Sequence, residues 1–207
     1  VNRRAFALGR LAAVNPALLS DAVGGTPRAE TLEEVIARRV AFLTDYQNAA
    51  YGARYRARLQ PVLALGDEAL SLAAARSLFR LMAYKDEYEV ARLHRDPGFA
   101  ARIAQSFGPG AKVSHHLAPP LWPTGHDARG RPNKRRFSGA LTRPAFALLA
   151  RMKGLRGTPF DLFGYHPERK LERDLIDWFD ALLARAAAEA GADLPCWRTI
   201  LAAPMGI

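Results

Sequence analysis

Residues Asp67 to His94 read DEALSLAAARSLFRLMAYKDEYEVARLH, and this stretch decides the class of fold. Its apolar side chains recur every three or four positions, which places them on one face of an α-helix. Pro97 follows the stretch and does not continue a helix. The pattern therefore predicts one long helix from Asp67 to about His94. The residues on its apolar face are Leu70, Ala74, Leu78, Leu81, Tyr84, Tyr88 and Ala91.

Helical patterns also precede this stretch. Thr31-Leu32-Glu33-Glu34 has the composition of a capping box, in which the threonine and the second glutamate satisfy each other's backbone N–H groups. The apolar spacing after it predicts a helix that continues to Gly52. A shorter helix over 53–59 is expected to end at Pro61.

Two further helices are expected downstream. The first is a short helix from Thr142 to Lys153. The second begins with Pro167 in its first turn and ends at Gly191, with an apolar stripe formed by Leu171, Leu175, Trp178, Leu182 and Ala186. We expect this helix to pack on the helix that starts at Asp67, through a core of Leu78, Leu81, Tyr84, Leu171, Leu175 and Trp178.

The net charge is concentrated in one segment. The 207 residues carry 30 lysines and arginines against 20 aspartates and glutamates, a formal charge of +10. The segment from Pro97 to Phe160 holds eleven of the basic residues and one acidic residue, Asp127, so it accounts for the whole excess. Prolines and glycines punctuate it, as in Gly108-Pro109-Gly110, which predicts loops with one or two short strands and no long helix before Thr142.

These patterns define the expected architecture. We expect a mainly α fold in a single domain over residues 1–207, with helical parts at 1–96 and 142–207 and an irregular basic insert at 97–141. The longest apolar runs are about 7 residues, far short of the roughly 18 that a membrane helix needs. No signal peptide is recognisable, and the single cysteine fits a reducing cytoplasm. Because the chain starts at Val1 and stops at Ile207 without a helix-ending signal, we expect a piece of a longer protein.

The sequence contains no catalytic or cofactor signature. Gly154-Leu155-Arg156-Gly157-Thr158 is too short for a phosphate loop and lacks its Lys-Ser/Thr ending. Cys196 is the only cysteine, which excludes an intrachain disulfide and an iron–sulfur cluster held by this chain alone. We interpret Cys196 as a buried structural thiol and not as a nucleophile. No catalytic, cofactor-binding or metal-binding residue is therefore assigned.

The spacing of the histidines does not favour a metal site. His115 and His116 are adjacent, and neighbouring side chains on a strand point to opposite faces, so the pair is expected to have one ring inside and one outside. His94, His126 and His166 have no partner at a metal-site spacing.

Two charged segments have open interpretations. Asp86 and Glu89 lie in a run of charges with Lys85 and Arg92, which is either a solvated helix face or a set of carboxylates that receives arginines of a partner or of the basic insert. The insert itself is either a packing and solubility surface or an anion-docking surface. It has no recognition helix and few aromatic residues, which disfavours nucleic acid. The candidate docking residues are Arg131, Lys134, Arg135, Arg136, His115 and His116.

Four segments together resemble the C-terminal region of the fused indolepyruvate ferredoxin oxidoreductases, which are 2-oxoacid:ferredoxin oxidoreductases. Their order and spacing match as well. Residues 2–9 are similar to the segment that follows the gamma-type domain of that family. The four segments are LMAYKDEYEVARL at 81–93, HLAPP at 116–120, GRPNKRRF at 130–137 and MKGLRGTPFDLFG at 152–164.

The resemblance implies a parent enzyme that oxidatively decarboxylates aryl 2-oxoacids to acyl-coenzyme A and reduces ferredoxin. Thiamine diphosphate and iron–sulfur clusters are implied for the parent, whose thiamine-binding domains precede this region. No cofactor is expected in this segment, and the isolated segment is expected to be inactive. Its partners would be the remaining domains, ferredoxin and coenzyme A. The alternative is an independent anion-binding module for nucleic acid or an acidic protein.

Overall fold

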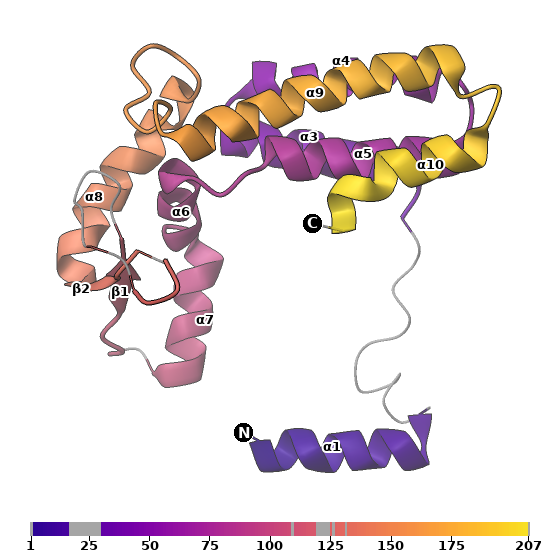
Figure 1. Ribbon diagram of the computed structural model, residues 1–207. Helices are drawn as coiled ribbons and strands as arrows, with labels where there is room; N and C mark the ends of the chain where they lie inside the picture. Colours follow the sequence, from indigo (N-terminus) through magenta and orange to yellow (C-terminus); the bar gives the residue numbers. More distant parts are fainter. Residues whose placement is uncertain are drawn as a thin grey trace.

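The computed structural model describes residues 2–16, 30–108, 110–118, 125, 127–130 and 132–206. The fold is mainly α, as the sequence predicts, and it has two parts (Figure 1). Long helices lie side by side in a bundle. A smaller unit, which contains the two strands and three shorter helices, lies at one end of that bundle and is called the hairpin unit below.

The bundle buries the main hydrophobic core. Its central helix α5 contacts α3, α4, α9 and α10, and its core side chains include Leu43, Tyr55, Leu78, Phe179 and Leu183, all at most 1% exposed. The helices span α3 Leu32–Tyr46, α4 Ala49–Leu63, α5 Glu68–Met82, α9 Pro167–Glu189 and α10 Leu194–Ala202, followed by the 3-10 turn η2 Ala203–Gly206.

The hairpin unit is inserted between α5 and α9. Its two strands are antiparallel, and the register pairs His115 with Phe137 and His116 with Arg136. Helix α8 packs on α6 beside the strands. The elements are α6 Glu87–His94, α7 Pro97–Phe107, β1 Ser114–Leu117, β2 Arg135–Ser138, α8 Gly139–Arg151 and the 3-10 turn η1 Met152–Leu155.

Helix α1, Asn2–Val14, lies apart from both parts in Figure 1 and exposes Phe6 and Val14. In the described part of the chain, no helix has the length and apolar character needed to cross a bilayer.

The predicted long helix from Asp67 to His94 is wrong, because the chain breaks between α5 and α6. In a continuous helix the carbonyl groups of Met82 and Tyr84 would accept from backbone N–H groups four residues later. Instead they accept hydrogen bonds from the hydroxyls of Tyr51 (3.0 Å) and Tyr46 (2.9 Å). Asp86 then starts α6 as its N-cap. Buried tyrosines of the bundle thus divide a pattern that reads as one helix.

The predicted boundaries before Asp67 also change. The capping box at Thr31 is present, but α3 ends at Tyr46 and Asn48 caps a new helix by accepting from Tyr51 N. Gly52 lies inside α4, where an added Cβ would stand 2.6 Å from Thr44 Oγ1. The absent side chain therefore lets α3 and α4 approach closely. Pro61 lies in the last turn of α4, which ends two residues later.

The insert is more helical than its composition predicts. Pro97 stands at the first turn of α7, and Asp96 caps that helix by accepting from Phe99 N at 2.9 Å. The proline therefore begins a helix as well as following one. Helix α8 begins at Gly139, three residues before the predicted start. The two short strands agree with the prediction.

The predicted core face of α9 is wrong by one helix position. Leu171, Leu175 and Trp178 are 58%, 37% and 51% exposed. The buried residues of this helix are Ile176, Phe179, Leu183 and Ala186. On α5 and beyond, Leu78 is buried, and Leu81 and Tyr84 are partly buried against the core.

Candidate functional site

A buried ion pair within the hairpin unit also contacts the bundle. The guanidinium of Arg156, directly after η1, donates from Nε to Asp86 Oδ2 (2.5 Å) and from Nη2 to Asp86 Oδ1 (2.8 Å). Its Nη1 donates to the carbonyl oxygen of Tyr46 in the bundle at 2.7 Å. The guanidinium carbon also lies 3.7 Å from the centre of the Tyr46 ring. The side chains of Arg156 and Asp86 are only 2% and 3% exposed.

This pair resolves one open interpretation of the sequence. Asp86 anchors an arginine of the same chain and also caps α6, because Oδ1 accepts from Glu89 N at 2.8 Å. Glu89 pairs with Arg92 on its own helix. Burial lowers the pKa of Arg156. Its hydrogen bonds to Asp86 and its electrostatic interaction with the Tyr46 side chain raise the pKa, which stays above the ordinary value. Arg156 is therefore a fixed cation.

The turn after Arg156 is tied to α6 by a second buried carboxylate. Asp161 accepts from the hydroxyl of Tyr88 at 3.1 Å and from the backbone N–H groups of Gly157 (2.9 Å) and Gly164 (3.1 Å). An added Cβ at Gly164 would stand 2.6 Å from Asp161 Oδ2. The close approach of carboxylate and backbone therefore requires glycine there.

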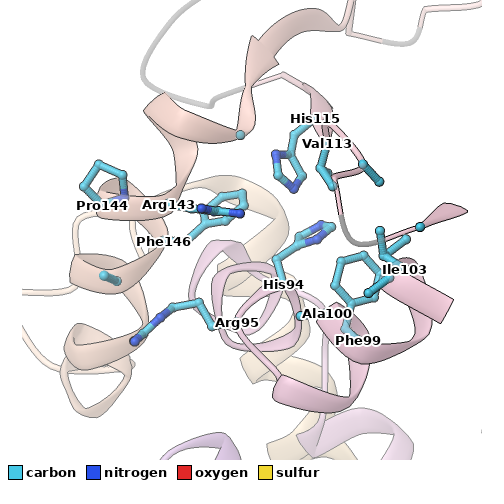
Figure 2. A pocket seen from close by; sticks show the side chains of 15 residues that line it. His94, Arg95, Phe99, Ala100, Ile103, Val113, His115, Arg143, Pro144 and Phe146 are labelled. Carbon is cyan, nitrogen blue, oxygen red and sulfur yellow. The ribbon is translucent and has the colours of Figure 1, made fainter.

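A pocket of about 550 Å³ opens between α6, α7, β1 and α8. Figure 2 shows two histidines at its centre, which come from α6 and β1. We call it the histidine pocket. The ring of His94 stacks on Phe146, with centroids 5.3 Å apart, and His115 meets His94 edge-on at 4.6 Å. Thr142 Oγ1 lies 2.9 Å from His115 Nδ1.

Both histidines of this pocket favour the neutral form. Burial lowers the pKa of His115, and burial together with the neighbouring His115 lowers the pKa of His94. The Nδ1 atom of His94 is buried and has no hydrogen-bond partner among the described residues. Arg95 and Arg143, both exposed, line the same pocket. The pocket thus combines aromatic walls, neutral imidazoles and two cations.

A larger cavity of about 660 Å³ lies beside the strands and is called the hairpin groove. Its lining is mainly apolar, and Lys85, Lys134 and Glu87 contribute charged groups. Burial raises the pKa of the Glu87 carboxyl. The groove shares His94 and Phe146 with the histidine pocket. Four chain segments meet there with α8, and they contribute Lys85, Asp86, Glu87, Val90, His116, Leu117, Ala118, Lys134, Phe137 and Phe163.

The structure separates the predicted docking residues. Lys134, Arg135 and Arg136 are exposed at and just before β2, and His116, also exposed, is paired in register with Arg136. His115 is half-buried among the rings of the histidine pocket, so the two histidines diverge as strand alternation predicts. Arg131 lies outside the described residues. We call the exposed group Lys134, Arg135, Arg136 and His116 the basic edge.

The donor set of this chain does not fit an iron–sulfur cluster. The single cysteine, Cys196, is exposed in the first turn of α10, so the prediction of a buried thiol is wrong. A cluster needs several thiolates. Within the described ranges no three His, Cys, Asp or Glu side chains gather as a metal site.

Sequence reasoning missed the residues that only the fold brings together. His94 and His115 lie on different elements, as do Asp86 and Arg156. A partial signal was present, since Asp86 followed by Glu89 is the spacing of a helix N-cap. Nothing local marks the other partners.

The fold is a helical bundle with an inserted hairpin unit. The chain belongs to the family of unknown function DUF6537, whose model matches residues 32–203. No curated protein and no solved structure matches it.

Proposed function

We propose that the chain is a non-catalytic C-terminal accessory domain of a cytoplasmic aryl 2-oxoacid:ferredoxin oxidoreductase of the indolepyruvate type, and that its basic edge docks ferredoxin. One observation carries the proposal. The four segments that resemble this enzyme family, at 81–93, 116–120, 130–137 and 152–164, all contribute residues to the hairpin groove. The segments that resemble the family are therefore far apart in sequence but line one cavity.

The charge of the hairpin supports a docking role. Three basic residues in succession, Lys134 to Arg136, are exposed next to the groove, within the segment that holds the whole formal excess charge. Ferredoxins are acidic as a class, and opposite charge on two surfaces accelerates their encounter. Exposed residues such as these are accessible to the surface of a partner protein.

Coenzyme A is a second candidate for the same region. The hairpin groove is mainly apolar and includes Lys85 and Lys134. An apolar cavity with a few cations suits a ligand that has a hydrophobic arm and phosphate groups.

The surface of α9 supports a role in assembly. Leu171, Leu175 and Trp178 follow one another at helical spacing and are more than one-third exposed. A row of large apolar side chains on a surface is typical of a protein interface. In the proposed parent enzyme this row would pack against the remaining domains.

The chemistry of the reaction would belong to those other domains. Thiamine diphosphate supplies the electron sink for decarboxylation and the clusters carry the electrons. The residues of this chain would supply the docking charge and the buried junction that holds the hairpin unit in place.

Charge reversal in the full-length enzyme tests the proposal. The variant Lys134→Glu/Arg135→Glu/Arg136→Glu is expected to raise the apparent KM for ferredoxin and to weaken its dependence on salt, because steering by charge fades as the screening length falls from about 10 Å at 0.1 M to about 3 Å at 1 M salt. Turnover with a small neutral acceptor should not change. Measuring KM for coenzyme A in the same variant distinguishes the two candidate ligands.

A matched control reverses three exposed basic residues elsewhere, Arg10, Arg76 and Lys170, and should leave KM for ferredoxin unchanged. If both variants raised the KM for ferredoxin equally, the effect would come from net charge and not from docking at the basic edge. An upstream reading frame without thiamine-binding sequence would contradict the parent enzyme and favour the alternative, an independent anion-binding module.

A further inference from the structure

A third cavity lies between the bundle and the turn that follows η1. Its volume is about 300 Å³, and its walls come from α4, α9 and the chain around Arg156. Three arginines from these three places line it, together with two tyrosines. We call it the arginine pocket, and its polar residues are Arg54, Arg156, Arg173, Tyr51, Tyr84, Gln47 and one carboxylate, Asp177.

The arginines of this pocket differ in how far they are neutralised. Arg156 is fully engaged by Asp86 and the Tyr46 carbonyl. Arg54 has only a long ion pair, 3.7 Å, with Asp177, and that carboxylate is held more closely by Arg58 at 3.2 Å. Arg173 makes no ion pair with a carboxylate of the described residues, and its Nη2 donates to the Gly164 carbonyl at 2.6 Å. Only Arg173 therefore lacks a carboxylate partner among the described residues, whereas Arg54 shares Asp177, which also lines the cavity, with Arg58.

One guanidinium nitrogen lacks a partner altogether. Arg173 Nη1 is buried and has no hydrogen-bond acceptor among the described residues. A buried N–H of a charged group without an acceptor is costly, and native structures usually satisfy such groups. Arg173 therefore keeps a hydrogen-bond donor that no acceptor of the described residues satisfies.

The two tyrosines add hydroxyl groups to the same walls. The Tyr51 hydroxyl donates to the Met82 carbonyl at 3.0 Å. Its oxygen can still accept a hydrogen bond from a ligand. Burial raises the pKa of Tyr84 to about 12, so its hydroxyl stays protonated at neutral pH. It can therefore donate a hydrogen bond.

We infer that the arginine pocket binds a phosphate group, which Arg173 and Arg54 hold by charge-assisted hydrogen bonds with the Tyr84 hydroxyl as a further donor. Guanidinium groups match the oxygens of phosphate in geometry and charge. Several donors from different directions suit a tetrahedral group with three or more acceptor oxygens better than a planar carboxylate. A volume of about 300 Å³ also admits a phosphate that is part of a larger molecule.

The position of the pocket gives binding a structural effect. Its walls include Arg156 and Gly157 of the hairpin unit's last turn and Arg54 and Arg173 of the bundle. A phosphate group bound there would link the same two parts of the molecule that the hydrogen bond from Arg156 to the Tyr46 carbonyl joins. Ligand that binds only the folded protein raises its stability.

Titration calorimetry and thermal unfolding of the chain test the inference at constant ionic strength. Inorganic phosphate is expected to bind saturably and to raise the Tm, and Arg173→Gln and Arg54→Gln should each weaken binding at least tenfold. The controls Arg56→Gln on α4 and Arg185→Gln on α9 change exposed arginines that do not line the pocket. They should leave binding unchanged.

Two further ligands identify the source of the phosphate. ADP that binds more tightly than inorganic phosphate, with the same loss in Arg173→Gln, would assign the pocket to a phosphorylated small molecule; the reverse order would assign it to free phosphate. Citrate that competes as well as phosphate would overturn the choice of phosphate over carboxylate. Absence of saturable phosphate binding, or equal binding by the Arg173→Gln and Arg54→Gln variants when folded, would overturn the site. None of these residues belongs to the basic edge, so this result is independent of ferredoxin docking.

Discussion

Arg156 connects three parts of the chain through its buried side chain. It is a buried cation that contacts Asp86 at the start of α6, the Tyr46 carbonyl at the end of α3, and the Tyr46 ring. The desolvation cost of such a pair is large, so its presence is weak evidence for net stability. Loss of one partner is a different matter, because the other charge then remains buried and unpaired.

Replacing Asp86 isolates that cost. Asp86→Asn keeps a side chain that can cap α6 but removes the charge beside Arg156, and we expect it to lower the free energy of unfolding by about 3–5 kcal/mol. Urea denaturation measures this. The exposed neighbour Arg151 on α8 provides the control, since Arg151→Ala should change stability by no more than about 0.5 kcal/mol. Equal stabilities of the Asp86→Asn variant and the unmodified chain would show that water reaches the pair.

The histidine pocket makes stability depend on pH. Burial lowers the native pKa of His94 and His115, whereas the unfolded value is about 6.5. Above about pH 6.5 both states are neutral, and the pair imposes no penalty. As the pH falls through that value the unfolded chain takes up protons first, so the free energy of unfolding decreases.

The measurement is a series of denaturation curves between pH 7.5 and 5. The double variant His94→Phe/His115→Phe is expected to lose less stability over this range than the unmodified chain, because its unfolded state no longer has these two imidazoles to protonate. His116→Gln changes an exposed histidine and should follow the unmodified chain. If the double variant retained the full pH dependence, the origin would lie in other groups.

At the scale of the element, α9 shows the ambiguity of helical patterns. Leu171, Leu175 and Trp178 recur at helical spacing, and so do Ile176, Phe179 and Leu183. Two apolar stripes therefore run side by side along one helix, and periodicity cannot tell which of them meets a neighbour. The packing of α9 against α4 and α5 buries the second stripe, Ile176, Phe179 and Leu183.

Alanine substitutions separate the two stripes. Leu183→Ala removes a side chain that is 1% exposed and is expected to cost about 2–5 kcal/mol, since it leaves a cavity in the core. Leu171→Ala trims a side chain that is 58% exposed and should cost much less. Thermal or urea unfolding of the two variants checks the order. If Leu171→Ala lowered the stability more than Leu183→Ala, the core would lie on the face that the sequence predicts.

Helix boundaries were predictable where the signal is local. The capping box at Thr31 and the proline at 167 mark true starts, because the partners of each signal lie within one turn. The break after Met82 was not predictable, since it depends on hydroxyls of Tyr46 and Tyr51, more than thirty residues away. The same holds for Gly52, whose role depends on how closely two helices cross.

For the whole molecule, composition and periodicity were enough to predict a mainly α fold with a basic insert and two short strands. The candidate site was predictable only as far as neighbours in sequence: Lys134, Arg135 and Arg136 remain together on an exposed edge. Asp86 and Arg156 are seventy residues apart and Arg54 and Arg173 more than a hundred, and no local pattern reports such pairs. The cavities they line therefore required the structure.

The place of the hairpin unit between α5 and α9 has a consequence for synthesis. Helices α3 to α5 leave the ribosome first, yet Phe179 and Leu183, which complete their core, follow only after the entire hairpin unit and the turn around Gly164 have been made. Domains generally fold as units during translation, and exposed apolar surface in the interval favours aggregation. The nascent chain should therefore need chaperone protection until α9 emerges, and its folding yield should depend on the translation speed of residues 87–166.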